Sequence, residues 1–232
     1  STMGGASLGG MDGMHKQGGL PIPNIVHIGQ PHWFLEGGDL SFEDFGLKVA
    51  QELATKIDEL GEDRVAAFIG EPIQGAGGVV VPPDNYWPEI QRICRERNIL
   101  LVADEVITGF GRTGRWFGSE YFGFEPDLMS IAKGLSSGYL PIGGVMFSNK
   151  VAEMLITKGG EFQHGYTYSG HPVSCAVAAE NIRLLREERV IENVESKVGP
   201  YFQQQLGLLG DHPIVGEIRG AGLIAGIQLA AD

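Results

Sequence analysis

Residues 100–114 read LLVADEVITGFGRTG, and this stretch decides the fold class. Together with Ile99, its first residues as far as Ala103 form a short, unbroken apolar run. Such a run is typical of a strand that is buried on both faces of a parallel sheet. Asp104 ends the run, and a glycine-rich segment follows. Because ligands of open α/β sheets lie beyond the carboxyl ends of the strands, we expect Asp104 at a ligand crevice.

The flanking segments alternate between strand-like apolar runs and amphipathic, helix-like stretches. Strands are predicted at 65–69, 99–103, 128–132 and 142–147, and helices from the Ser41 cap to Leu60 and at 84–97, 150–158 and 172–188. Small residues in the last helix predict close packing on the sheet. The order strand, helix, strand over 65–103 is a βαβ unit with a right-handed crossover. The sequence therefore predicts an α/β fold with a mainly parallel sheet.

The two ends of the chain differ from this pattern. Residues 1–40 are rich in Gly and Pro, which predicts an extended surface loop. After residue 188 we expect a helix over 190–209, kinked at Pro200, and strands at 214–219 and 223–227. We interpret residues 1–187 as a large domain that lacks its N-terminal part, and 188–232 as the beginning of a smaller α+β domain.

Composition excludes several functional classes. The formal charge of −12, from 29 acidic and 17 basic residues, opposes binding to nucleic acid. No apolar stretch is long enough to cross a membrane, and no Cys or His spacing indicates a metal site. Cys94 and Cys175 are expected to be buried free thiols in a reducing compartment, which favours a cytoplasmic location.

Lys133 follows the predicted strand 128–132, just as Asp104 follows 99–103. The two side chains are therefore expected to face one crevice. Burial would lower the pKa of the lysine and make a nucleophilic amine, while the carboxylate would need a cationic partner. From these two residues alone, a structural ion pair is at least as well supported as catalysis.

The wider sequence resembles a known family. Three segments are similar to the cofactor-attachment signature of class III pyridoxal-phosphate aminotransferases: DEVITGFGRTG at 104–114, PDL at 126–128 and AKGL at 132–135. Three further segments agree in order: EPIQGAGG at 71–78, YLPIGG at 139–144 and HGYTYSGHP at 164–172. Within this family, the sequence most resembles the pyruvate-dependent transaminases of amines, ω-amino acids and diamines such as putrescine. The fold implied is the fold type I, aspartate aminotransferase-like large domain.

The resemblance also implies roles for single residues. Lys133 would be the Schiff-base lysine for pyridoxal 5'-phosphate and the base that moves the substrate proton. Asp104 would pair with the pyridine N1–H, and Val106 would pack on one ring face. Glu71 would lie near Asp104 or the substrate entrance, although capping of its own glycine-rich turn is an equal alternative. Thr167 would contact the cofactor phosphate of a neighbouring subunit.

Other polar residues of these motifs are interpreted structurally. We expect structural roles for Ser169 and His171, because His171 precedes Pro172 at a helix start, where capping is common. Arg112 and Arg115 are expected in salt links rather than as clamps for a substrate carboxylate. Ile107, where some relatives that handle 4-aminobutyrate have glutamine, fits the pyruvate-dependent branch.

The implied activity is transfer of an amino group from a primary amine, diamine or ω-amino acid to a 2-oxo acid such as pyruvate. The cycle would be ping-pong through pyridoxamine phosphate, in a homodimer or dimer of dimers with shared active sites. The alternatives are another class III enzyme, namely an aminomutase, racemase or decarboxylase, or a partial chain that is inactive alone. The phosphate-binding loop and the arginine for the substrate carboxylate are expected outside this chain.

Overall fold

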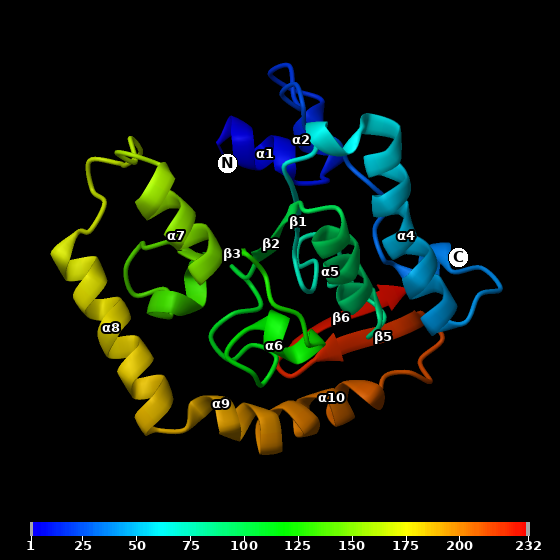
Figure 1. Cartoon of the computed structure of the whole chain (residues 1–232). Coiled ribbons are helices and arrows are strands. Elements are labelled where there is room, and N and C mark those ends of the chain that lie inside the picture. The colour runs from blue at the N-terminus through cyan, green and yellow to red at the C-terminus, as the bar shows by residue number, and fades with distance from the viewer. Residues whose placement is uncertain (1, 231–232) are drawn as a thin grey trace.

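A four-stranded sheet forms the centre of the computed structural model, which describes residues 2–230 (Figure 1). Its strands lie side by side in the order β1 (Ala67–Gly70), β2 (Leu100–Asp104), β3 (Leu128–Ile131) and β4 (Gly144–Phe147). The first three are parallel, whereas β4 is antiparallel to β3. The predicted α/β class and the mainly parallel sheet are confirmed.

Helices α4 (Phe42–Leu60) and α5 (Tyr86–Glu96) pack against each other beside this sheet. α5 connects β1 to β2 and completes the predicted βαβ unit. α4 begins at the predicted cap, where the Ser41 hydroxyl accepts a hydrogen bond from Asp44 N at 3.0 Å. It ends before Gly61, whose φ of 91° is easily adopted only by glycine.

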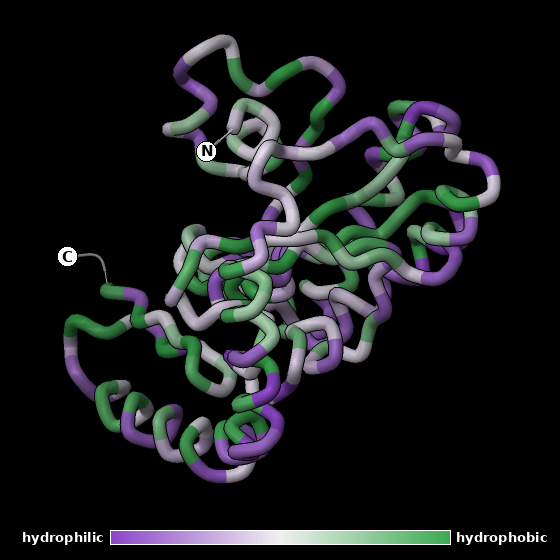
Figure 2. The backbone as a smooth tube through the Cα atoms, turned by 90° about the vertical axis from the view of Figure 1, so that its left-hand side faces the viewer, coloured by the Kyte–Doolittle hydropathy of each residue, from purple (hydrophilic) through white to green (hydrophobic). Residues whose placement is uncertain are grey.

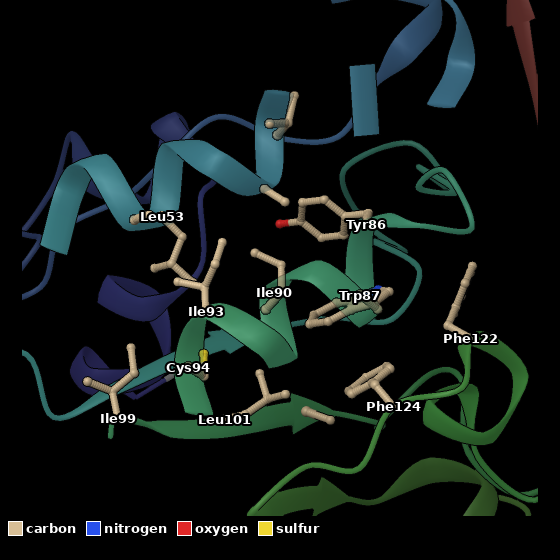
Figure 3. Packing of buried hydrophobic residues seen from close by; sticks show 14 of the residues in the cluster. Leu53, Tyr86, Trp87, Ile90, Ile93, Cys94, Ile99, Leu101, Phe122 and Phe124 are labelled. Atoms are coloured by element: carbon tan, nitrogen blue, oxygen red, sulfur yellow. The ribbon is translucent and has the colours of Figure 1, made fainter. Parts of the chain in front are cut away.

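The main hydrophobic core joins these helices to β2 (Figure 3). In it, the Trp87 ring stacks on Phe124 with centroids 4.5 Å apart. The indole Nε1 of Trp87 also donates a hydrogen bond to Pro72 O at 3.1 Å. Since Pro72 follows Glu71, the core holds the turn at the end of β1 in place.

Beyond β4 the chain forms an outer arm of helices (Figure 1). It comprises α7 (Asn149–Lys158), α8 (Pro172–Glu187), α9 (Val190–Asn193) and α10 (Gly199–Gly207). A π-helical segment, Val194–Val198, links the last two, and Gly199 N–H bonds to Val194 O. Pro200 has no N–H to continue a regular ladder, so the kink predicted there takes the form of this widened turn. Figure 2 shows that hydrophilic and hydrophobic stretches alternate along the lower part of this outer arm, as they do in amphipathic helices.

The chain then forms the antiparallel hairpin β5 (Val215–Ala221) and β6 (Ile224–Leu229), which confirms the two strands predicted there. Ala221 is buried in the main core, and Ile224 packs against it. The hairpin therefore shares its core with α4 and α5. The proposed division into domains at residue 188 stays a prediction.

Three expectations about local structure are wrong. The segment 1–40 is not only loop, because it contains α1 (Met3–Leu8), α2 (Asp12–His15) and α3 (Trp33–Glu36). These helices are too short to produce a visible apolar period. Short helical turns η1 (Glu62–Arg64), α6 (Gly118–Phe122) and η2 (Lys133–Ser136) were likewise not predicted.

The other two wrong expectations concern α8. Only Ala178 of this helix is buried among the described residues, so its small side chains do not pack broadly on the sheet. Cys175 is exposed for the same reason, whereas Cys94 is buried as expected. Within residues 2–230, no helix has both the length and the apolar character required to cross a bilayer.

Candidate active site

Asp104 is the last residue of β2, at the carboxyl edge of the parallel strands. Its partner across the strand pair is Ser130 of β3. The Asp104 Oδ1 atom accepts hydrogen bonds from Ser130 Oγ at 3.0 Å and from Val106 N at 3.1 Å. Among the described residues, no hydrogen bond to Oδ2 is found. The carboxylate is thus held by one oxygen and presents the other.

Lys133 lies just beyond β3, in the turn η2, and is therefore at the same edge of the sheet as Asp104. Its φ of 39° lies in the left-handed region that a residue with a side chain seldom occupies. Such conformations persist only where the surroundings impose them, and they gather at functional sites. The strand end and the turn together fix where the lysine side chain departs from the sheet.

One expectation about Lys133 is not fulfilled, and one open alternative is not realised. Its side chain is exposed rather than buried, because it departs from the turn η2, beyond the end of β3. No salt bridge joins it to Asp104 or to another acidic group within residues 2–230. The structural ion pair that the sequence left open is therefore not formed, and both charged groups remain available to a ligand.

Glu71 follows β1 directly and brings a third ionisable group to this edge. Its Oε2 atom accepts a hydrogen bond from Gly75 N at 2.9 Å, so the turn-capping alternative is realised. Burial raises the pKa of the Glu71 carboxyl above its ordinary value, and the negative charge of Asp104 adds to the rise. The Gly75 hydrogen bond and the positive charge of Lys133 lower it again. Glu71 thus caps its turn and also lies within electrostatic range of Asp104 and Lys133.

Glu105 is a site residue whose role the sequence did not indicate. Its side chain is fully buried, with 0% of the residue exposed. It accepts hydrogen bonds from Thr108 Oγ1 at 2.5 Å, Ser119 N at 2.6 Å and Gly118 N at 2.8 Å. A buried carboxylate needs such donors to offset the loss of water. Its position next to Asp104 was the available signal, but its donors lie up to 14 residues away in the chain.

The remaining signature residues have structural contacts. Arg112 Nη1 donates to Leu223 O at 3.2 Å, and Arg115 forms a salt bridge with Glu195 at 2.8 Å. Both contacts join residues 112–115, at the end of the signature loop, to the C-terminal part of the chain. The salt link expected of Arg115 is formed, whereas Arg112 bonds to a backbone carbonyl and forms no salt bridge within residues 2–230. Val106 is half-buried beside Asp104. A Cβ added at Gly75 would lie 2.2 Å from Ile107 Cδ1, so glycine lets the turn after Glu71 lie against Ile107.

Thr167 forms no hydrogen bond with the other predicted site residues within residues 2–230. It is exposed in the segment that precedes α8, where Ser169 Oγ accepts a hydrogen bond from Tyr166 N at 2.9 Å. The expected side-chain cap at His171 is not formed, and α8 begins with Pro172 at its first turn. Proline at the first helical position has no N–H group, so the first turn has one unsatisfied donor fewer. The chain therefore brings Asp104, Lys133 and Glu71 to one edge of the sheet, and the role of Thr167 stays a prediction.

Comparisons with known proteins agree on one family. The family described as Aminotransferase class-III matches residues 1–232. The chain is 60% identical over its whole length to the putrescine–pyruvate aminotransferase of Pseudomonas aeruginosa, of which it covers 51%. It is 46% identical to gamma aminobutyrate transaminase 3 of Solanum lycopersicum, with 98% of this chain and 44% of that protein covered. The chain thus spans about half the length of the curated relatives that it matches.

Solved structures give the same result for the fold. An (S)-enantioselective omega-transaminase from Thermomicrobium roseum matches with a TM-score of 0.94 at 46% identity, over 99% of this chain and 51% of that one. The omega transaminase from Pseudomonas jessenii, solved in complex with PMP, also has a TM-score of 0.94 at 46% identity, over 98% of this chain and 51% of its own. The expected transaminase fold is confirmed, and the chain belongs to the class III aminotransferase family.

Proposed function

We propose that the protein carrying this chain transfers an amino group from a primary amine, diamine or ω-amino acid to pyruvate, with pyridoxal 5'-phosphate as cofactor. One observation carries the proposal: Asp104 and Lys133 lie at the carboxyl ends of adjacent parallel strands without neutralising each other. The 60% identity to a putrescine–pyruvate aminotransferase supports the choice of donor and acceptor.

The residues at this edge fit the cofactor. Pyridoxal phosphate supplies an aldehyde that a lysine amine can bind covalently and a ring that withdraws electrons from the substrate. The exposed Lys133 amine, which forms no salt bridge with the described residues, is suited to that attachment. The Asp104 Oδ2 atom has no other hydrogen bond within residues 2–230 and is suited to accept one from a protonated ring nitrogen. Val106 would pack against the ring.

The reaction requires one group that holds a proton and another that moves one. The Asp104 carboxylate, oriented by hydrogen bonds from Ser130 Oγ and Val106 N, would accept the hydrogen bond of the protonated ring nitrogen. Once released by the incoming amine, Lys133 Nζ would take the proton from the substrate carbon and return it at the other reacting carbon. Glu71 would hold the turn after β1 beside this pair through its hydrogen bond from Gly75 N.

The assembly part of the proposal concerns Thr167. We propose that the protein is a homodimer or a dimer of dimers, in which Thr167 binds the cofactor phosphate of the neighbouring subunit. The segment that carries it is lined with exposed aromatic side chains, namely Phe162, Tyr166 and Tyr168. Exposed aromatic groups in one patch are typical of a surface that another chain covers. We further propose a cytoplasmic location, which the two free cysteines support.

The test is alanine formation. The purified protein would be incubated with pyridoxal phosphate, pyruvate and one donor at a time: putrescine, β-alanine, 4-aminobutyrate or a simple primary amine. We expect alanine in amounts that match the consumed donor, and none with the Lys133→Ala variant. If no donor yields alanine, or if the Lys133→Ala variant yields as much as the native protein, the proposed function is wrong.

A further inference from the structure

The turn that carries Lys133 is unusual in its backbone. Lys133 has a φ of 39° and Ser137 a φ of 49°, both left-handed in residues with side chains. Gly138 follows with a φ of 77°. A turn of this kind relaxes unless its surroundings hold it. The question is therefore which contacts impose this conformation on the lysine.

Asn181, in the middle of α8, makes such contacts with its whole side chain. Its Nδ2 atom donates hydrogen bonds to Gly134 O at 2.9 Å and Leu135 O at 3.0 Å. Its Oδ1 atom accepts a hydrogen bond from Ser137 Oγ at 2.7 Å. Both donor hydrogens and the acceptor oxygen of the amide are thus used on residues 134–137.

The opposite side of the turn rests on the signature loop. A Cβ added at Gly134 would lie 3.0 Å from Phe110 Cβ and 3.4 Å from Gly109 O, so the turn and the loop are in close contact. Gly109 N in turn donates to Glu105 O at 2.9 Å. The turn therefore lies between α8 and a loop that is anchored next to Asp104.

We infer that Asn181 is a positioning residue for Lys133: its amide fixes the turn 133–138 so that the lysine amine is held at the edge where Asp104 lies. This inference rests on the proposed function for the role of the amine. It assigns α8 a part in the site although no α8 residue is among those expected to contact the cofactor. Without the Asn181 amide, Lys133 would still be present, but its side chain would no longer be held in the reactive position.

The chain offers a matched control in Gln203. Its Nε2 atom also donates to two backbone carbonyls, Gly222 O at 2.9 Å and Ile224 O at 3.2 Å, but at the β5–β6 turn. Asn181→Leu and Gln203→Leu thus remove the same kind of clamp, one at the lysine turn and one at the hairpin. Ser137→Ala removes only the hydroxyl contact to Asn181 and serves as a milder variant that retains the amide.

Two readouts on the whole protein separate this inference from the proposed function. The first, without cofactor, is hydrogen exchange of the amides of Leu135, Ser137 and Tyr139, which bond within this turn. The second, with cofactor, is the split between kcat and KM for alanine formation. We expect Asn181→Leu to speed exchange in the turn and to lower kcat by about 10- to 100-fold with KM for pyruvate little changed, as for a misplaced reactive group. Ser137→Ala should give a smaller change in the same direction.

The control decides between positioning and general destabilisation. Gln203→Leu is expected to leave exchange at 135–139 and kcat near native values even if it lowers the melting temperature equally. The inference is overturned if Asn181→Leu and Gln203→Leu have equal effects on exchange in the turn and on kcat. If the native protein forms no alanine, the proposed function fails, and unchanged exchange in Asn181→Leu would then also refute the clamp.

Discussion

Ser130 Oγ donates a hydrogen bond to Asp104 Oδ1 at 3.0 Å, and the two residues are direct partners across the β2–β3 strand pair. The sheet register thus sets the orientation of the carboxylate. Because β3 also leads into the turn that carries Lys133, a single strand pairing positions both candidate catalytic residues. The register of this pair is therefore the main link between the fold and the proposed chemistry.

The first prediction concerns that hydrogen bond. Ser130→Ala should leave Asp104 held only by Val106 N and should cost about 1 kcal/mol of cofactor binding, or about fivefold in Kd. Absorbance titration of the native protein and the variant with pyridoxal phosphate measures this change in Kd. Ser196→Ala is the control and should leave Kd unchanged, since within the described residues the Ser196 hydroxyl donates only to Glu192 O, at 2.7 Å. Equal Kd values for both variants would contradict the orienting role of Ser130.

The second prediction concerns the buried carboxylate of Glu105. Glu105→Ala removes the acceptor of three hydrogen bonds and leaves their donors buried, so the free energy of unfolding should fall by roughly 3 kcal/mol. Glu105→Gln, which keeps one acceptor oxygen, should lose less. Urea denaturation of the three proteins measures the difference. A loss below about 1 kcal/mol in Glu105→Ala would mean that the carboxylate does not hold the loop.

The third prediction follows from the raised pKa of Glu71. A carboxyl whose pKa is higher in the folded than in the unfolded protein stabilises the fold below its ordinary pKa of 4.5, and that contribution is lost as pH rises through the folded value. Relative to the native protein, Glu71→Gln should therefore gain stability as pH rises above 4.5. Its amide oxygen still accepts from Gly75 N, so the turn is retained. The melting temperatures of both proteins, measured at increasing pH from 4.5, test this change in relative stability. A difference in melting temperature that stays constant or changes in the opposite direction would contradict the pKa shift.

The sequence alone predicted the parts of this fold that depend on local pattern. Apolar runs located all four sheet strands to within a few residues, and the Ser41 cap and Gly61 marked both ends of α4. The ends of the chain were predicted less well, because α1 to α3 are too short to show a period. The exposure of Cys175 was missed because burial depends on which elements meet, not on local composition.

The candidate site was predictable to a similar extent. Asp104 and Lys133 were found because each follows an apolar strand and each belongs to a recognisable motif. Asn181 and Glu105 were missed because their partners lie far away in the sequence, up to 47 residues for Asn181. Whether a lysine is buried or a buried carboxylate is satisfied follows from tertiary contacts, which no spacing within one motif reveals.

Covalent trapping at Lys133 tests the central claim most directly. The protein would be mixed with pyridoxal phosphate, reduced with borohydride, digested and analysed by mass spectrometry, with Lys133→Ala treated in parallel. We predict a single dominant pyridoxyl adduct on Lys133, an absorbance band near about 400 nm that reduction removes, and neither signal in the variant. Equal labelling of Lys133→Ala, or an adduct spread over other lysines with Lys133 unmodified, would contradict the assignment.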